Sequence, residues 1–303
     1  MHVGVIGVGA MGRNHVRVYS ELRGVDQVHI YDLDKNRMLE LASEVVVPEP
    51  SQAELLKNVD VVSICVPTEL HWSVTNTAIE YGIPALVEKP FTADAKEALD
   101  ILSMCDSNRV RVGVGHIERF NPVVAEIQKI VKEPLYVEFK RHNPASARMM
   151  NGSIVEDLMI HDIDIVRNVL FPAKEYELYS MGTPDLCTAT FRFNSTVVSL
   201  SASRKASKKL RSVLIEEEER TIEGDFMSQE VYIYRKPGKY SIDAGQYRQE
   251  NIIEKLMVNK VEPLREELKA FINSVRNHVP FPVTPLQAYE NMKLCEAIKN
   301  GLF

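Results

Sequence analysis

The stretch VEDLMIHDIDIV, residues 155–166, sets five ionisable side chains among apolar ones. On a helix, Asp157 and His161 stand four positions apart and share one face, which Asp164 and Asn168 continue. An imidazole beside a carboxylate can take up a proton near neutral pH, can bind a divalent metal, or can form the polar edge of an amphipathic helix. No third and fourth ligands follow at metal-binding spacing, so we expect no metal site. Proton transfer and a solvated helix edge both stay open on these residues alone.

A glycine-rich stretch near the start of the chain is typical of dinucleotide binding. In GVIGVGAMGRNH, Gly7, Gly9 and Gly12 form G-x-G-x-x-G between a strand pattern and a helical pattern. The first glycine permits a tight turn, the second lets a pyrophosphate approach the backbone, and the third allows close packing of helix on strand. We expect this loop, with Ala10 and Met11 inside it, to hold a pyrophosphate at the helix N-terminus. The alternative is a glycine turn that binds nothing.

Asp32 indicates which dinucleotide the loop would hold. It ends the second strand pattern, about 20 residues beyond the loop, where a carboxylate can accept a hydrogen bond from a ribose 2′-hydroxyl. Its charge would repel a 2′-phosphate, which favours NAD over NADP. Arg37 lies five residues later and could soften that preference.

The helices and strands that must position these residues show two different sequence patterns along the chain. Residues 1–115 alternate continuous Val/Ile runs with helical patterns, which indicates a parallel sheet covered on both faces. Beyond this region, strands with polar alternate positions indicate a largely antiparallel sheet, accompanied by helices at 155–166 and 263–278. Helical spacing predicts a last helix at 284–301.

The predicted fold is therefore an α/β Rossmann domain followed by an α+β domain with an open, mostly antiparallel sheet. We expect the first, NAD-binding domain to span residues 1–118 and the second, a substrate and oligomerisation domain, to span 119–303. The last helix is able to pack back on the first domain.

Composition narrows the class of protein. The 303 residues carry a formal net charge of −6, which argues against nonspecific binding to nucleic acid or to an acidic membrane. No run of eighteen apolar residues and no cleavable apolar leader occur in the sequence. The four cysteines are widely spaced and show no metal-binding pattern. We expect a cytoplasmic protein whose partner is a small molecule.

Three further stretches match one known family. VPTELH (66–71) and VEKPFT (87–92) each end a strand pattern of the first domain, and Asp157 and His161 match D-x-x-x-H. With the glycine loop, they make the chain resemble the Gfo/Idh/MocA oxidoreductase family over both domains. The resemblance implies that Lys89 converges with Asp157 and His161 beside the nicotinamide of NAD. It also implies a homodimer or homotetramer formed through the open sheet.

The roles of these residues follow from the resemblance and from their chemistry. His161 would accept the proton of a sugar hydroxyl, Lys89 would polarise the same oxygen, and Asp157 would orient His161 or the substrate. In such families the peptide before Pro90 is commonly cis. Glu88 is expected to bond the nicotinamide ribose, with a strand-end salt bridge as the alternative. Further cofactor contacts are expected from Pro67, Thr68 and His71, although His71 could equally pack at a helix N-terminus.

The stretches GHIERFNP (115–122) and RHNPASARMMNGSIVEDLMIHDID (141–164) resemble a subgroup that oxidises the 3-hydroxyl of UDP-N-acetylglucosamine. Guanidinium groups suit phosphate, so the resemblance suggests arginine contacts to the diphosphate or uridine. The expected substrate residues, besides Asp157 and His161, are His116, Arg119, Asn121, Arg141 and Arg148.

The sequence thus predicts an NAD-dependent dehydrogenase that converts a sugar ring hydroxyl to a ketone. UDP-N-acetylglucosamine, oxidised at the 3-position, is the expected substrate. A dehydrogenase of a free sugar or of a polyol such as myo-inositol is the first alternative. The second alternative is a protein that senses the dinucleotide and performs no turnover.

Overall fold

A computed structural model of the protein describes residues 1–144, 153–238, 240–243, 246–249 and 251–301. The chain forms two compact units, each described by itself: unit 1 is Met1–Phe120 with Glu262–Lys293, and unit 2 is Asn121–Val261 with Leu294–Phe303. The domain limits 1–118 and 119–303 stay a prediction; the packing places residues 262–293 in unit 1. Within the described part of the chain, none of the helices combines the length and apolar character that a membrane crossing requires.

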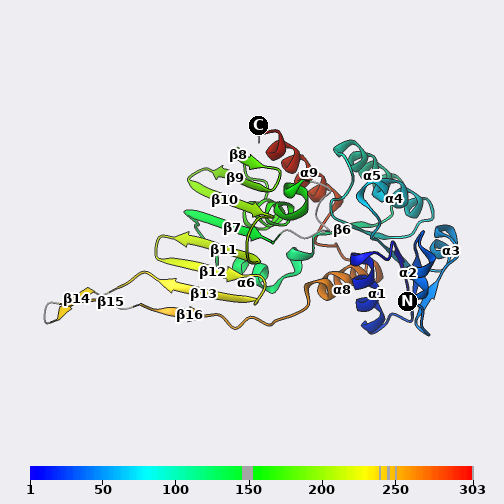
Figure 1. Ribbon diagram of the computed structural model, residues 1–303, viewed down its shortest axis with the longest axis horizontal. Coiled ribbons are helices and arrows are strands. Elements are labelled where there is room, and N and C mark those ends of the chain that lie inside the picture. The colour runs from blue at the N-terminus through cyan, green and yellow to red at the C-terminus, as the bar shows by residue number, and fades with distance from the viewer. Residues whose placement is uncertain (145–152, 239, 244–245, 250, 302–303) are drawn as a thin grey trace. The chain divides into compact units, whose positions relative to one another are not determined.

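Unit 1 contains a six-stranded parallel sheet with the order β3-β2-β1-β4-β5-β6 (Figure 1). Every residue of β4 and β5 is buried, as expected of strands covered by helices on both faces. The order reverses between β1 and β4, so the loops after these strands lie at a topological switch point. The strands are β1 (His2–Ile6), β2 (Gln27–Tyr31), β3 (Val46–Pro48), β4 (Val61–Ile64), β5 (Ala85–Glu88) and β6 (Val112–Gly115).

Polar side chains cap three of the helices of unit 1. Asp34, Ser51 and Asp94 each accept a hydrogen bond from a backbone N–H in the first turn of α2, α3 and α5, respectively. The apolar faces of the unit's helices pack on the sheet to form one core. The helices are α1 (Ala10–Glu21), α2 (Lys35–Leu39), α3 (Gln52–Lys57), η1 (Thr68–Leu70), α4 (His71–Glu80), α5 (Ala95–Asn108), η2 (Ile117–Phe120), α8 (Pro263–Arg276) and the first part of α9 (Pro285–Asn300).

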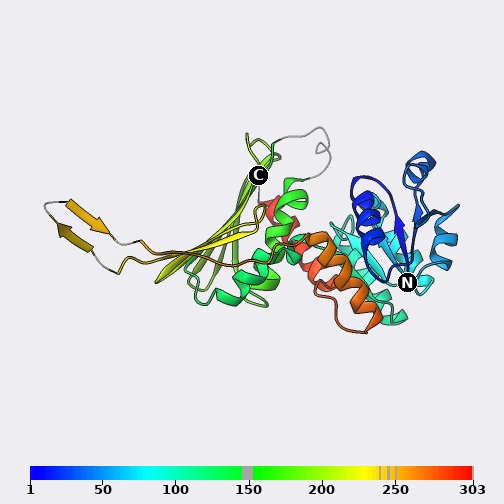
Figure 2. The ribbon, with the colours of Figure 1, turned by 90° about the horizontal axis from the view of Figure 1, so that it is seen from below.

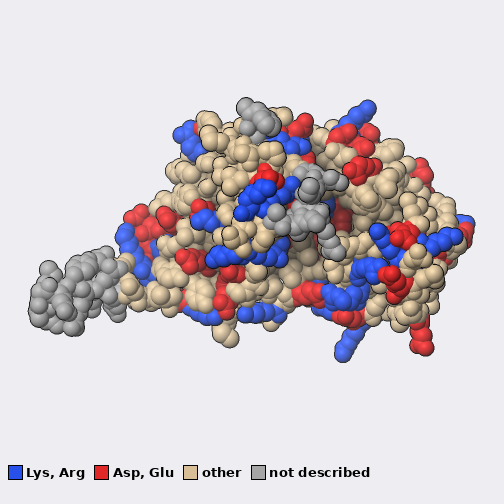
Figure 3. Space-filling model, in the orientation of Figure 1, with Lys and Arg blue, Asp and Glu red and all other residues tan. Residues whose placement is uncertain are grey.

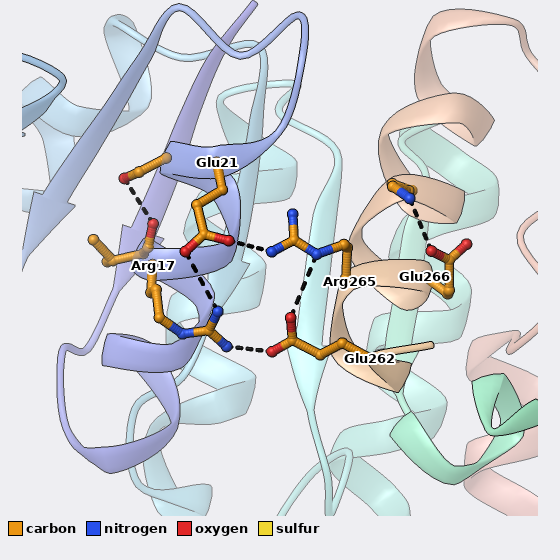
Figure 4. Close-up of polar contacts among 8 residues, drawn as sticks. Arg17, Glu21, Glu262, Arg265 and Glu266 are labelled. Carbon is orange, nitrogen blue, oxygen red and sulfur yellow. Dashed lines mark hydrogen bonds and ion pairs between the residues drawn. The ribbon is translucent and has the colours of Figure 1, made fainter. Parts of the chain in front are cut away.

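Helix α8 lies beside α1, and four charged side chains connect them (Figure 4). Arg17 pairs with Glu21 at 3.6 Å and also with Glu262. Arg265 pairs with Glu262 at 3.4 Å and also with Glu21. Exposed ion pairs of this kind each add little stability, so the buried apolar face of α8 carries most of the attachment.

Unit 2 contains an eight-stranded sheet with the order β16-β13-β12-β11-β7-β10-β9-β8. All neighbouring strands are antiparallel except β7 and β10, which run parallel, so the predicted mostly antiparallel sheet is confirmed. Buried and less buried residues alternate along β7 and β9, so one face of the sheet packs against the hydrophobic core. The strands are β7 (Tyr136–His142), β8 (Glu177–Thr183), β9 (Leu186–Phe193), β10 (Thr196–Ser203), β11 (Leu210–Glu217), β12 (Arg220–Asp225), β13 (Glu230–Arg235) and β16 (Ile253–Lys255).

Helices cover that core face, which Figure 2 shows with the sheet nearly edge-on. Helix α6 (Pro122–Ile130) packs closely on β12, because a Cβ added at Gly224 would stand 2.8 Å from the Val123 side chain. The predicted helix at 155–166 is confirmed and runs on to residue 170. Its middle is α-helical and its two ends are π-helical: η4 (Val155–Met159), α7 (Ile160–Ile165) and η5 (Val166–Leu170).

A two-stranded hairpin of β14 (Tyr240–Asp243) and β15 (Gln246–Gln249) extends beyond the eight-stranded sheet (Figure 1). On the face drawn in Figure 3, basic and acidic side chains are interspersed, in keeping with the small net charge of −6.

Candidate active site

The loop after β1 has the geometry that a pyrophosphate needs. Gly7 has a φ of +86°, a backbone conformation that favours glycine. A Cβ at Gly12 would stand 1.9 Å from the Gly7 carbonyl oxygen, so only glycine fits there. A Cβ at Gly9 would meet nothing within 4 Å, which leaves open space beside the first turn of α1. An anion in that space can approach the N–H groups of the turn that contains Ala10 and Met11.

A cavity of about 520 Å³ opens beside this loop. Its lining comes from the carboxyl ends of three strands, and includes Gly9 after β1, Asp32 after β2 and Pro67 after β4. These loops flank the point where the strand order reverses, which is where open α/β sheets bind ligands. The cavity thus joins four of the expected cofactor residues, since Gly7 lines it as well.

Backbone N–H groups hold the Asp32 carboxylate at the edge of this cavity. Oδ2 accepts the N–H of Val8 at 2.8 Å, and Oδ1 accepts that of Asp34 at 2.9 Å. Each carboxylate oxygen has a second lone pair, so Asp32 can still accept a ribose hydroxyl. Arg37 lines the same cavity, and its Nε lies 3.3 Å from Asp34. The glycine loop, the cavity and Asp32 together fit the adenosine and pyrophosphate portions of a nicotinamide dinucleotide.

His71 is buried and bridges two loops of unit 1. Its Nδ1 lies 2.8 Å from the carbonyl oxygen of Pro90, and its Nε2 lies 3.0 Å from that of Val66. These contacts show His71 packed at the start of α4, which is the alternative to cofactor contact that the sequence left open. Thr68 begins η1 in the same segment. Contact of His71 or Thr68 with a cofactor stays a prediction.

Lys89 directly follows β5, and its peptide bond to Pro90 is cis, as in the families that the chain resembles. The neighbouring Glu88 is buried; its Oε1 lies 3.0 Å from Nε2 of His15, and its Oε2 accepts the Lys89 backbone N–H at 3.2 Å. Burial acts to raise the pKa of Glu88, but the hydrogen bond and charge of His15, together with Lys89, hold that pKa below its ordinary value. Glu88 is thus an ionised, strand-end partner of His15, and its bond to a nicotinamide ribose stays a prediction.

Asp157 and His161 lie one turn apart on the helix of residues 155–170, and both are half-buried. The buried Arg204 places Nη2 3.5 Å from Oδ2 of Asp157. Further along, Asp164 is buried and accepts a hydrogen bond from Nδ2 of Asn168 at 3.0 Å. The polar stripe is therefore not a solvated edge along its whole length, because its second half is packed and hydrogen-bonded.

Arg141 is buried, with its guanidinium group on the carboxylate of Asp162. Nη2 lies 2.7 Å from Oδ1, and the side chains are 1% and 2% exposed. The ion pair gives Arg141 a structural partner, and its contact with a substrate phosphate stays a prediction.

Asn121 begins α6 and is also held by structural contacts. Its side-chain oxygen accepts the N–H of Val123 at 3.1 Å, and its Nδ2 donates to the carbonyl oxygen of Phe226 at 3.0 Å. These bonds cap the helix and attach it to the end of β12, so a substrate role is not needed to explain this residue.

Three further expected substrate residues differ in their surroundings. His116 is buried directly after β6. Arg119 is half-buried, with Nη1 3.4 Å from the carbonyl oxygen of Pro282. Arg148 lies outside the described residues.

The predicted catalytic residues divide between the two units. Lys89 belongs to unit 1, whereas Asp157 and His161 belong to unit 2, and the convergence of the three stays a prediction. The sequence reasoning missed His15 and Arg204. His15 lies inside the glycine-rich stretch, three positions after Gly12, and a titratable side chain so near the loop was a usable signal. Nothing in the sequence around Arg204 indicated its contact with Asp157.

The strand order, the glycine loop and the placement of Asp32 define a Rossmann-type dinucleotide-binding protein. A model of the Gfo/Idh/MocA family, described as an oxidoreductase family with an NAD-binding Rossmann fold, matches residues 1–116. The chain is also 32% identical over 292 residues to the UDP-N-acetylglucosamine 3-dehydrogenase of Acidithiobacillus ferrooxidans, a match that covers 92% of the chain and 90% of that protein. The chain therefore belongs to the Gfo/Idh/MocA family and is an oxidoreductase, as the resemblance indicated.

Other comparisons agree with this assignment. An inositol 2-dehydrogenase of Mycolicibacterium smegmatis is 31% identical over 179 residues, which cover 55% of the chain and 52% of that protein. The solved structure of the A. ferrooxidans UDP-N-acetylglucosamine 3-dehydrogenase GnnA matches with a TM-score of 0.88 at 29% identity, covering 100% of the chain and 97% of that structure. A putative oxidoreductase of Magnetospirillum magnetotacticum, at 22% identity and a TM-score of 0.83, shows the likeness of fold alone.

Proposed function

We propose that the protein oxidises the 3-hydroxyl of UDP-N-acetylglucosamine to a ketone, with NAD as the acceptor. The observation that carries this proposal is the extent of the similarity to known dehydrogenases. The UDP-N-acetylglucosamine 3-dehydrogenase matches over 92% of the chain and therefore over both units, whereas the inositol 2-dehydrogenase matches over 55%. The match over both units includes the unit that carries Asp157 and His161, so it supports the nucleotide sugar.

The protein's own residues would then perform three tasks. The glycine loop and Asp32 would bind the cofactor, which, when bound, accepts hydride from the sugar carbon. Lys89 would donate a hydrogen bond to the reacting hydroxyl oxygen, and His161 would take its proton at an imidazole nitrogen. Asp157, paired with the buried Arg204 at 3.5 Å, would orient His161 or the sugar.

The expected arginine contacts now differ in their support. Arg141 is occupied by Asp162, so Arg119 and Arg148 are the stronger candidates for the diphosphate. Oxidation of a free sugar or polyol is the second candidate function, supported by the inositol 2-dehydrogenase match. Such a substrate carries no diphosphate and would not depend on these arginines.

We also propose NAD rather than NADP as the cofactor. Asp32 is fixed by two backbone N–H groups at the cavity, and its charge opposes a 2′-phosphate. Arg37, which could bind that phosphate, lies 3.3 Å from Asp34 and is thus already paired with a carboxylate. A cytoplasmic location is proposed as well, because Cys65, Cys105 and Cys187 form no disulfide within the described part of the chain, as expected of a reducing compartment.

We propose further that the protein assembles as a homodimer or homotetramer through the uncovered face of the unit 2 sheet. Exposed apolar side chains alternate with core residues on this sheet, among them Tyr179, Met181 and Val197, at 68%, 76% and 38% exposure. A sheet face that none of the described helices covers, and that carries such side chains, is suited to pairing with a second copy.

The test is NADH absorbance after mixing the purified protein and NAD with UDP-N-acetylglucosamine, myo-inositol or glucose, each separately. A rise with the UDP-sugar alone is the expected result. A rise with inositol or glucose alone would replace the substrate and keep the reaction class. Silence with all three, in a protein that binds NADH by fluorescence, would favour the non-catalytic sensor and overturn the proposal for these substrates.

A further inference from the structure

A buried histidine–glutamate pair in unit 1 lies beside Lys89. His15 is fully buried on α1, one turn after the glycine loop, and its Nε2 lies 3.0 Å from Oε1 of Glu88. The second carboxylate oxygen of Glu88 accepts the backbone N–H of Lys89 at 3.2 Å. A single carboxylate therefore connects the helix of the dinucleotide loop to the residue proposed to hold the reacting oxygen.

The surroundings hold this carboxylate in one position. Glu88 ends β5 and is in register with Gly115 on β6, where an added Cβ would stand 3.1 Å from Oε1. The glycine thus leaves room for the carboxylate. The ring of His15 packs edge-on against that of Tyr19, with the centroids 6.2 Å apart, so it has little freedom to turn.

Because His15 and Glu88 are buried, the hydrogen bond between them has a strong effect on the position of the carboxylate. Glu88 is 9% exposed and His15 is 0% exposed, so water has little access to the hydrogen bond between them. A buried carboxylate without its donor would turn, or would lose its charge, to recover its solvation. The first change would move the acceptor of the Lys89 N–H, and the second would weaken it.

We propose that His15 is a positioning residue, which acts through Glu88 to fix the backbone at Lys89 relative to the dinucleotide loop. The inference rests on the proposed role of Lys89. It assigns His15 no contact with substrate, cofactor or the reacting atoms. His15 instead fixes the position of the Lys89 backbone, from which the lysine side chain extends.

Two substitutions at His15 separate the hydrogen bond from the packing. His15→Leu removes the donor, and His15→Gln keeps an amide N–H at nearly the place of Nε2. The matched control is His29→Leu, because His29 is likewise buried in unit 1 and lies 2.7 Å from a carboxylate, that of Glu49. Loss of the His29–Glu49 pair should lower the stability of the protein without changing the position of the Lys89 backbone.

The first measurement needs neither cofactor nor substrate. Hydrogen–deuterium exchange of the peptide that contains Lys89 should be about tenfold faster in His15→Leu, and unchanged in His15→Gln and His29→Leu. The second measurement is steady-state kinetics with NAD and UDP-N-acetylglucosamine. We expect kcat of His15→Leu to fall about 10- to 100-fold, with less than about a twofold change in KM for NAD, and His15→Gln to recover most of the rate.

The outcomes separate this inference from the proposed function. Unchanged exchange at Lys89 in His15→Leu, or equal kcat losses in His15→Leu and His29→Leu, would overturn the positioning role. Lys89→Met tests the proposed function by itself. If Lys89→Met kept full turnover, the role of Lys89 would be wrong, whereas the exchange result would still decide whether His15 holds its backbone.

Discussion

Arg141 and Asp162 form a bidentate ion pair inside unit 2, with side chains 1% and 2% exposed. Nε of the arginine lies 3.1 and 3.0 Å from the two carboxylate oxygens, and Nη2 lies 2.7 Å from Oδ1. The guanidinium also lies over the ring of Phe226, 5.8 Å from its centroid. The pair fastens the middle strand β7 to α7, the helix that carries His161.

Removing one member of this pair should destabilise the protein strongly. Arg141→Met leaves a buried carboxylate without its partner, so we expect a loss of about 3–5 kcal/mol in the free energy of unfolding, measured by urea denaturation. The double variant with Asp162→Leu should lose less than Arg141→Met alone. Arg192→Met, which breaks an exposed pair with Glu177, is the control and should change stability little. Equal stability of Arg141→Met and Arg192→Met would contradict the structural role.

Asp162 also shows how far the sequence could predict the site. A carboxylate within the apolar arc of a helix either needs a buried partner or marks the start of the helix, and the structure shows the first of these. The identity of that partner could not be predicted, because Arg141 lies 21 residues away on a strand whose pairing depends on the whole sheet. The same limit applies to the contact of Arg204 with Asp157.

The glycine loop, by contrast, could be predicted from local signals in the sequence. The loop requires a positive φ at Gly7 and the absence of a Cβ at Gly12. Both requirements appear as glycines within one short stretch, so the loop can be recognised from the sequence. The sequence pattern of residues 211–225 predicts a strand, whereas the structure forms two antiparallel strands there, β11 and β12. The π-helical turns around α7 had no sequence signal, since they depend on how the helix packs.

Cofactor choice should change at Asp32. We expect Asp32→Ser to weaken NADH binding about tenfold, in line with the 1.5–3 kcal/mol typical of hydrogen bonds to charged groups, and to weaken NADPH binding less or improve it. Fluorescence titration with each dinucleotide measures both affinities. Glu44→Gln is the control, because Glu44 is an exposed carboxylate of unit 1 that does not line the cavity. An unchanged NADH/NADPH ratio in Asp32→Ser would refute the assignment.

Glu88 should make stability depend on pH in a defined direction. Its pKa is lowered in the folded protein, so it contributes stability that is present above the ordinary glutamate pKa of about 4.3 and is lost as pH falls through the lowered folded pKa. Glu88→Gln removes this contribution. We therefore expect the stability gap between the wild type and Glu88→Gln to be largest near neutral pH and to shrink in acid. Urea unfolding at several pH values measures the gap, and a gap that widens as the pH falls would show that the sign is wrong.

Proton transfer should fail without His161. We expect His161→Ala to lower kcat about 10²- to 10⁴-fold, the usual contribution of a general base, when NADH formation is followed with the active sugar. The exposed His278 supplies the control, and His278→Asn should keep full activity because Asn tolerates its positive φ of 53°. If His161→Ala retained its turnover while Lys89→Ala lost it, Lys89 rather than His161 would be the base.

Assembly should depend on the uncovered sheet face of unit 2. Met181 and Val197 point away from the core there, so Met181→Glu combined with Val197→Glu would bring like charges of two copies together in a symmetric interface, at a cost of several kcal/mol. Light scattering of the purified protein should give at least the dimer mass for the wild type and the monomer mass for the double variant. Met257→Glu is the control, because Met257 is 97% exposed beyond β16 and lies outside the sheet. A wild type that scatters as a monomer, or a double variant that keeps the wild-type mass, would rule out assembly through this face.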